Sequence, residues 1–421
     1  MTSTASRRLQ VRLACTHRTR AAAVIAVAIL CPVLPSRAAE PPSTRPHPAS
    51  HPAASRPSSL DARENDALRE LLDGIRTRHK LPALGGAIVD LDGVRSIAAV
   101  GIRRHGSAEA VTPHDLFHIG SCTKAMTSTV IARLIEEGTL DWTTTPADVF
   151  PELSDAMDPA FRKATLELLL THRAGAPADL NADGLWARLW ERRGSPIEQR
   201  LDLLRSVLAR PPVSEPGRRY LYSNAGYAIA GAIAERKTGL SWEDLMRRKL
   251  FEPLGMKSAG FGAPGAVGGG DVPWGHVLRE GKLTPIEPGP MADNPPAIAP
   301  AGTVHCTLSD WGRFVALHLR GSKEDTPLLK RDAFHRLHTP SRGADYAMGW
   351  IVTQREWGGT VQTHAGSNTM WYGVVWMAPQ KDFAVLAVTN LGDPAATHAC
   401  DEAAWQLIQH VLTSTEKRQD D

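Results

Sequence analysis

The chain lacks the features that mark several classes of protein. Neither H-E-x-x-H nor C-x-x-C occurs in its 421 residues, and its 16 histidines are scattered, so we expect no metal and no cofactor. No apolar run is long enough to span a bilayer, and no stripe of lysine and arginine suggests nucleic acid. These absences favour a small molecule or a peptide as substrate, and they indicate no particular oligomeric state.

Cysteine is also scarce. Of five cysteines, two lie in the first 58 residues, and Cys122, Cys306 and Cys400 remain. Three cysteines far apart in the sequence exclude a disulfide-rich scaffold and a zinc cluster. Their spacing leaves open whether one pair of them forms a bridge.

The first 58 residues differ from the rest in charge. They carry eight arginines against one glutamate, so the remaining residues hold a formal charge of about −4 although the whole chain has +3. A basic start, an apolar stretch at residues 21–34 and small residues after it are typical of a secretory signal peptide, which we predict for residues 1–39. We therefore expect an exported protein, periplasmic or extracellular. The alternative is a retained anchor, and only this segment, if uncleaved, would then contact the membrane.

A second change in composition separates the start of the chain from its folded part. Residues 40–59 are rich in proline, serine and alanine. Because such a composition cannot build a packed core, it predicts a disordered spacer. We expect one folded domain at residues 60–415 and a polar tail at residues 416–421.

The strand patterns lie at the two ends of this domain. Two apolar runs flank a turn at Asp92 and Gly93, which predicts a hairpin. Residues 346–390 predict an antiparallel meander, and a last helix is expected from about residue 399 to residue 412. The fold class is therefore α+β, of the α/β sandwich type: an antiparallel sheet flanked by helices and built from about 60–117 and 296–415.

The middle of the domain, about residues 118–295, mixes short helices with long loops and predicts a mostly helical insertion. Residues 123–138 form its clearest helix, with one apolar side and a glycine at its end. Residues 259–300 are dense in glycine and proline. A long loop in a compact domain usually has a function, so we expect this segment to line a substrate cleft between the two parts.

A serine and a lysine lie at the start of that helix, in "GSCTKAMT". Residues three apart on a helix lie on one face, so the Lys124 amine could activate the Ser121 hydroxyl, which is otherwise a poor nucleophile. The simpler interpretation is a helix cap beside a solvated charge. The same S-x-x-K spacing recurs at Ser414 and Lys417, so the spacing alone does not decide.

The second motif is Tyr222-x-Asn224, the only Y-x-N in the chain. A phenol near a lysine ammonium has its ionised form favoured and can act as a general base. An asparagine two residues later can hold the lysine and a substrate amide. The simpler interpretation is a tyrosine before a core helix with Asn224 as its cap.

The third motif is H-x-G in "QTHAGSNTM" at the end of a predicted strand. His364 could donate to Tyr222 or to substrate, and Gly366 allows close approach of the backbone. The Ser367 N–H could be the second oxyanion donor, beside that of Ser121. A histidine at a strand end can equally be structural.

Together, these motifs resemble the serine β-lactamase and penicillin-binding-protein superfamily, in particular its class C β-lactamase-like group. Blocks such as "FHIGSCTKAMTSTVIARLIEEGTLDW", "LLLTHRAG" and "HAGSNTMWYG" follow the order of that family, and the resemblance runs from about residue 60 to residue 412. It implies a β-lactamase/transpeptidase-like fold and a serine hydrolase that works through an acyl-enzyme.

The resemblance also implies a role for each residue. Ser121 would be the acylated nucleophile, Lys124 its activating partner and Tyr222 the general acid/base. Asn224 would position Lys124 and the substrate. His364 would support Tyr222 and the far end of the substrate.

One departure from the family pattern bears on the substrate. Ala365 stands where carboxypeptidases and β-lactamases of this type usually carry a hydroxyl that helps to bind the substrate carboxylate. Together with His364 in place of a lysine, this favours an esterase or amide hydrolase with uncharged substrates. A DD-carboxypeptidase or D-aminopeptidase, and a β-lactamase, are the alternatives. A binding or regulatory protein with weak turnover is the alternative from another class.

Overall fold

The computed structural model describes residues 59–265, 272–341 and 343–420. The predicted signal peptide, and the predicted spacer except Ser59, lie outside these residues. The described part is a mixed structure of helices and antiparallel strands, as the sequence predicts. Among its helices, none combines the length and the hydropathy needed to cross a membrane.

A seven-stranded antiparallel sheet forms one half of the domain, with strand order β2-β1-β12-β11-β10-β9-β8. Its strands are β1 (Ala83–Val89), β2 (Val94–Gly101), β8 (Tyr346–Ala347), β9 (Trp350–Arg355), β10 (Gly359–Ser367), β11 (Tyr372–Ala378) and β12 (Phe383–Thr389). At the centre, β1 pairs with β12, with Leu84 opposite Thr389. The prediction of a sheet built from both ends of the chain is therefore confirmed.

The hairpin between β1 and β2 shows how the local sequence sets this edge. Every residue of β1 is buried, as expected for an apolar strand covered on both faces. In the turn, the Asp90 Oδ1 accepts hydrogen bonds from the N–H groups of Asp92 and Gly93. Gly93 has φ +135°, a backbone conformation that is easy only for glycine.

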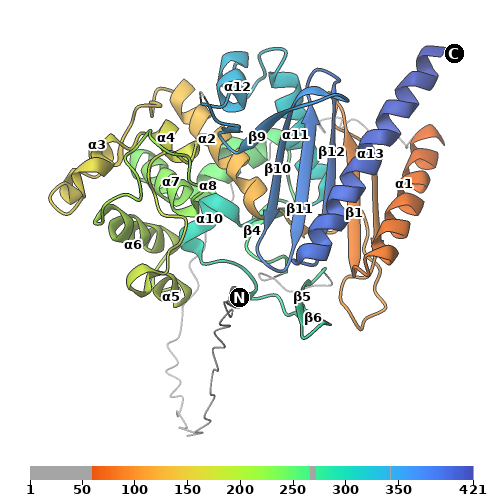
Figure 1. Cartoon of the computed structure of the whole chain (residues 1–421), viewed down its shortest axis with the longest axis horizontal. Helices are drawn as coiled ribbons and strands as arrows, with labels where there is room; N and C mark the ends of the chain where they lie inside the picture. Colours follow the sequence, from red (N-terminus) through yellow and green to blue (C-terminus); the bar gives the residue numbers. More distant parts are fainter. Residues whose placement is uncertain (1–58, 266–271, 342, 421) are drawn as a thin grey trace, which may run out of the picture. The chain divides into compact units, whose positions relative to one another are not determined.

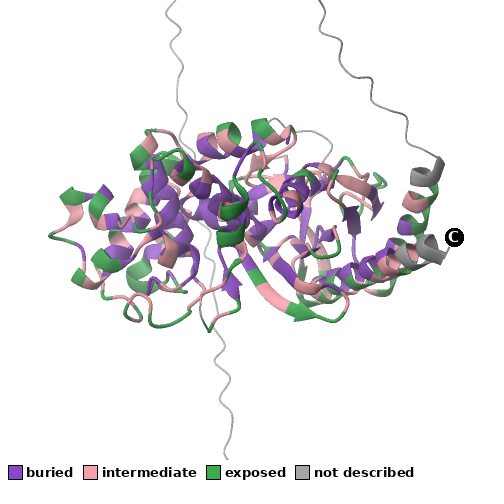
Figure 2. Cartoon of the chain, turned by 90° about the horizontal axis from the view of Figure 1, so that it is seen from above, coloured by how far each residue is buried: buried purple, intermediate pink, exposed green. Residues whose placement is uncertain are grey.

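Helices cover both faces of the sheet (Figure 1). On the outer face, α1 (Ser59–Arg78) packs against β1 and β2, and α13 (Pro394–Asp420) packs against β1, β11 and β12, with the apolar side chains between them buried. On the inner face, α11 (Leu308–Gly321) packs in the larger core cluster, which continues into the helical part. Figure 2 shows buried residues throughout both parts. The last helix was predicted too short, because α13 begins before residue 399 and continues into the predicted polar tail.

The helical part lies between β2 and the late strands in the sequence. Its three long helices are α2 (Thr123–Glu136), α6 (Pro196–Leu208) and α7 (Asn224–Thr238). Shorter helices are α3 (Pro146–Val149), α4 (Leu166–Leu170), α5 (Leu185–Trp190), α8 (Trp242–Met246) and α9 (Glu252–Leu254), and α10 (Ala299–Gly302) and α12 (Arg331–His338) follow later in the chain. A buried Arg200 on α6 pairs with Glu235 and Glu243 and holds α6, α7 and α8 together.

The described residues of the glycine- and proline-rich segment form regular elements that its composition does not suggest. It contains β4 (Gly260–Phe261) and a hairpin of β5 (Gly275–Arg279) with β6 (Lys282–Ile286). β4 joins β3 (Phe117–His118) and β7 (Val304–Cys306) in a small three-stranded sheet. Because β3 ends two residues before Gly120, this small sheet ties the segment to the start of α2.

Candidate active site

The three predicted motifs meet at the start of α2. A 3₁₀ turn at Gly120–Cys122 leads directly into the helix, and Gly120 takes φ +50°. Ser121 is partly exposed on this turn, whereas Lys124 is completely buried. The turn therefore presents a reachable hydroxyl above a lysine that water does not contact.

Lys124 has three oxygen neighbours. Its Nζ lies 3.0 Å from Ser121 Oγ, 2.8 Å from Asn224 Oδ1 and 2.7 Å from the Ala301 carbonyl oxygen. The two carbonyl-type oxygens can only accept hydrogen bonds, whereas a serine hydroxyl can also donate. A neutral amine would thus satisfy both carbonyls with its two hydrogens and aim its lone pair at the Ser121 hydroxyl.

Burial supports that neutral form. It lowers the pKa of Lys124 to about 7, opposed by the nearby Cys122 thiol. An ammonium without water is costly, and no carboxylate is among the causes of this shift. Near neutral pH, about half of the molecules would carry a free amine at this position, which is the state required of a base.

Asn224 and Tyr222 lie at the start of α7. Ser223 caps this helix, because its hydroxyl accepts a hydrogen bond from the Gly226 N–H at 3.3 Å. The interpretation in which Asn224 is the cap is therefore wrong. Asn224 is the first residue of α7 and turns its amide oxygen to Lys124, as the motif predicts.

The Tyr222 ring lies against the lysine, with Nζ 4.7 Å from the ring centre. Burial raises the pKa of the Tyr222 phenol, and a hydrogen bond with Ser121 opposes this shift. The expectation that a nearby ammonium favours the phenolate is therefore wrong for this geometry. Tyr222 is a protonated phenol beside Ser121, so it is arranged to give a proton rather than to take one.

His364 differs most from its prediction. Its Nδ1 lies 2.6 Å from the Ala365 carbonyl oxygen and its Nε2 lies 3.2 Å from Tyr346 Oη. Burial and the Lys124 charge lower the pKa of His364 to about 3. The ring is therefore neutral, Nδ1 carries the proton, and Tyr346 donates to Nε2. The hydrogen-bond partner of Nε2 is therefore Tyr346 and not Tyr222. The ring centres of Tyr222 and His364 lie 6.4 Å apart.

The Gly366–Ser367 backbone meets the nucleophile turn at contact distance. A Cβ atom on Gly366 would lie 2.4 Å from the Ser121 nitrogen, and one on Gly120 would lie 2.3 Å from the Ser367 nitrogen. Only glycine permits this approach. The Ser121 nitrogen thus lies beside Gly366 and the Ser367 nitrogen beside Gly120, and their role as the two oxyanion donors stays a prediction. Ala365, by contrast, packs against the outer core cluster.

Sequence analysis missed two members of this site. His172 accepts the Ser223 N–H on its Nδ1 at 3.1 Å and the Leu221 N–H on its carbonyl at 2.8 Å, and its ring lies 4.3 Å from that of Tyr222. It therefore holds the chain on both sides of Tyr222. Its block, "LLLTHRAG", was visible as a family feature, whereas no pattern marked Tyr346.

Other candidates lie outside this site. The second S-x-x-K copy lies within α13, where Ser414 Oγ donates to the His410 carbonyl. Cys122, Cys306 and Cys400 are free and buried, so no disulfide joins any two of these three cysteines. Among the described residues, no group of three or more histidine, cysteine or acidic side chains is placed to hold a metal.

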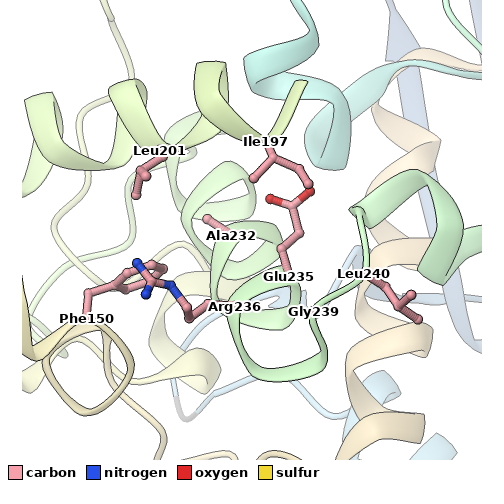
Figure 3. Close-up of a pocket in the computed structure, with 8 residues that line it drawn as sticks. All are labelled: Phe150, Ile197, Leu201, Ala232, Glu235, Arg236, Gly239 and Leu240. Atoms are coloured by element: carbon pink, nitrogen blue, oxygen red, sulfur yellow. The ribbon is translucent and has the colours of Figure 1, made fainter. Parts of the chain in front are cut away.

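Two cavities of the described structure can be compared with the candidate site by the residues that line them. A cavity of about 250 Å³ between α6 and α7 is lined by apolar side chains with Glu235 and Arg236 (Figure 3). Its carboxylate is already paired with Arg200, so it is not the candidate active site. A larger cavity, about 590 Å³, is lined mainly by residues between 260 and 303. The glycine-rich segment thus lines a cavity, and its effect on specificity stays a prediction.

The chain belongs to the beta-lactamase family, whose model matches residues 68–409. It is similar to penicillin-binding protein 4 of Amycolatopsis lactamdurans, with 33% identity over 255 residues that cover 60% of this chain and 63% of that protein. It is also similar to the unguisins hydrolase ungD' of Aspergillus campestris, with 27% identity over 316 residues that cover 72% of this chain and 56% of that protein. The chain thus matches less than two thirds of each relative.

A solved structure shares the fold. The octameric penicillin-binding protein homologue from Pyrococcus abyssi matches with a TM-score of 0.66 and 24% identity, over 81% of this chain and 77% of that chain. Fold and family together place the chain in the superfamily of serine β-lactamases and penicillin-binding proteins.

Proposed function

We propose that the protein is an exported serine hydrolase of the class C β-lactamase-like group that forms an acyl-enzyme on Ser121. One observation carries the proposal. The Nζ of a fully buried lysine lies 3.0 Å from Ser121 Oγ while two carbonyl oxygens occupy its other hydrogens. This arrangement supplies the base that a serine nucleophile needs.

The first half-reaction uses each group once. The Lys124 amine takes the Ser121 proton, and Oγ attacks the carbonyl carbon of an ester or amide. The oxyanion is held by the N–H groups of Ser121 and Ser367. When the bond to the leaving group breaks, the Tyr222 hydroxyl protonates that group, and Tyr222 recovers a proton from the Lys124 ammonium. Water then attacks the acyl-enzyme, and its proton passes to the same groups as Ser121 is released.

The electrostatics favour an uncharged acyl group. With its pKa at about 3, His364 has no positive charge near neutral pH, so it cannot pair with a substrate carboxylate. The preferred substrates are therefore esters or amides without that carboxylate. Cleavage of wall peptides as a DD-carboxypeptidase or D-aminopeptidase, or of β-lactams, is the alternative. The relatives named a penicillin-binding protein and an unguisins hydrolase support hydrolysis without choosing among these bonds.

The test compares wild type, Ser121→Ala and Ser414→Ala on a chromogenic short-chain ester. The last variant is a matched control, because it removes the serine of the second S-x-x-K copy. We expect a burst and turnover in wild type and Ser414→Ala and neither in Ser121→Ala, with an acylating phosphonate found on Ser121 by mass spectrometry. Equal turnover in Ser121→Ala would contradict the proposal. Absence of both labelling and turnover in wild type would favour a binding protein.

A further inference from the structure

A buried histidine lies two residues before the nucleophile turn. His118 has no exposed surface, and its Nδ1 accepts the Gly120 N–H at 3.1 Å. The other ring nitrogen, Nε2, therefore carries the proton and donates to Asp293 Oδ2 at 2.9 Å. Gly120 is the residue before Ser121, so this side chain fixes the backbone from which the Ser121 N–H projects.

The same carboxylate reaches the end of β10. Asp293 is only 2% exposed, and its Oδ1 accepts the Asn368 Nδ2 at 3.0 Å and the Asn294 N–H at 2.8 Å. Asn368 follows Ser367 directly, and its own amide oxygen accepts the Met370 N–H at 3.1 Å. The side chain thus fixes the backbone around the Ser367 N–H.

One carboxylate therefore ties together the two segments that carry the oxyanion donors. These segments already meet with no space for a Cβ atom at Gly120 or Gly366. The Asp293 backbone is itself anchored, because Arg192 Nη2 donates to its carbonyl at 2.6 Å. Hydrogen bonds to a carboxylate are stronger than neutral ones, and burial increases the difference. The bridge is well suited to hold a fixed spacing.

We propose that Asp293, through His118 and Asn368, is a positioning residue that sets the spacing of the Ser121 and Ser367 N–H groups. The inference rests on the proposed function and goes beyond it, because Asp293 lies outside the three motifs and is linked to them through His118 and Asn368. A misplacement of about 1 Å costs up to ~100-fold in rate, and loss of one donor costs about 100- to 1000-fold. A carboxylate outside the motifs thus controls the alignment of two of them.

The test is Asp293→Asn in the full chain. This substitution keeps the shape of the side chain but removes its negative charge and replaces one acceptor oxygen by an NH₂ group. We expect kcat/KM for the ester to fall about 10- to 100-fold. The affinity for a boronic acid, which forms a tetrahedral adduct on Ser121, should fall by the same factor. KM should change less than about twofold. A purely structural role would lower the amount of folded enzyme and leave the boronic acid affinity of that fraction unchanged.

Two further variants keep the result interpretable. Asp310→Asn is the matched control, because Asp310 is another buried carboxylate whose Oδ2 accepts the Ser258 N–H at 2.7 Å away from the site. Of the bridge, Asn368→Ala removes only the hydrogen bond between Asp293 and the end of β10. This variant tests the proposal if Asp293→Asn does not fold. We expect it to lower the rate and the boronic acid affinity together. The double variant should have the same kcat/KM and boronic acid affinity as the less active of the two single variants.

The outcomes separate the two proposals. If the ester is cleaved through Ser121 but these variants keep the wild-type kcat/KM, or lose rate without losing boronic acid affinity, the positioning role is overturned. If Ser121→Ala is as active as wild type, the proposed function itself has failed.

Discussion

The pH dependence of acylation tests the role of Lys124 directly. If the free amine is the base, kcat/KM rises tenfold per pH unit below about 7 and levels off above it, because burial lowers the pKa of Lys124 to about 7. A lysine with its ordinary pKa of 10.5 would have only about one amine in 3000 free at pH 7. The position of the acid limb therefore reports the burial of this one side chain.

Asn224→Asp moves that limb in a known direction. The substitution puts a carboxylate where an amide oxygen now lies 2.8 Å from Nζ. An opposite charge at this distance favours the ammonium and raises the pKa by about 1 to 3 units. We expect kcat/KM at pH 7 to fall about 5- to 500-fold, and to return to within about twofold of wild type by pH 10.

The assay is ester cleavage from pH 5 to pH 10, corrected for spontaneous hydrolysis. Asn65→Asp on α1 is the control, because the Asn65 amide oxygen also accepts one hydrogen bond of 2.8 Å, from the Ile97 N–H, but on the outer face of the sheet. It changes the net charge equally and should leave the limb in place. A limb that stays near 7 in Asn224→Asp, or moves to lower pH, would refute the assignment of Lys124 as the base.

Two further predictions concern the same region. In Gly366→Ala the new Cβ would lie 2.1 Å from the Ile119 carbonyl oxygen, so we expect kcat/KM to fall at least ~100-fold; a loss below threefold would contradict the close approach. Lys124→Met should abolish turnover and remove a pH dependence of stability. Between pH 7 and 10.5 the unfolded wild type binds a proton that the folded state does not, so wild-type stability rises with pH across this window, by at most about 5 kcal/mol. In urea unfolding the variant should lack this rise, and it should be the less stable protein at pH 10.5 because the oxygens of Asn224 and Ala301 lose their donor.

The sequence predicts the fold well because the fold leaves local patterns, and the same kind of pattern predicts which motif residues lie side by side. Alternating apolar runs mark the strands, and helical spacing places Lys124 beside Ser121. The end of α13 was missed for a local reason as well: the residues after 412 include glutamate, lysine, arginine and glutamine, which favour helices even when polar.

Partners and protonation states could not be predicted, because they depend on segments far apart in the sequence. α2 was expected to have one apolar side, yet it is buried on nearly every side, since it runs between the sheet and the helical part. Thr127 is satisfied there by the Pro300 carbonyl. The same long-range packing lowers the pKa of Lys124, gives His364 the partner Tyr346 and brings Asp293 to His118.

The pairing of β1 with β12 also sets the order in which the protein can be made. Leu84 has its partner at Thr389, so in a growing chain the β1 edge of the apolar hairpin stays unpaired until nearly the whole sequence has been synthesised. Such an edge invites aggregation, and long-range pairing slows folding. The sheet therefore closes only after synthesis is almost complete. A ribosome that stops before residue 383 releases a chain that has its nucleophile and lysine but lacks the strand that joins the two halves of the sheet.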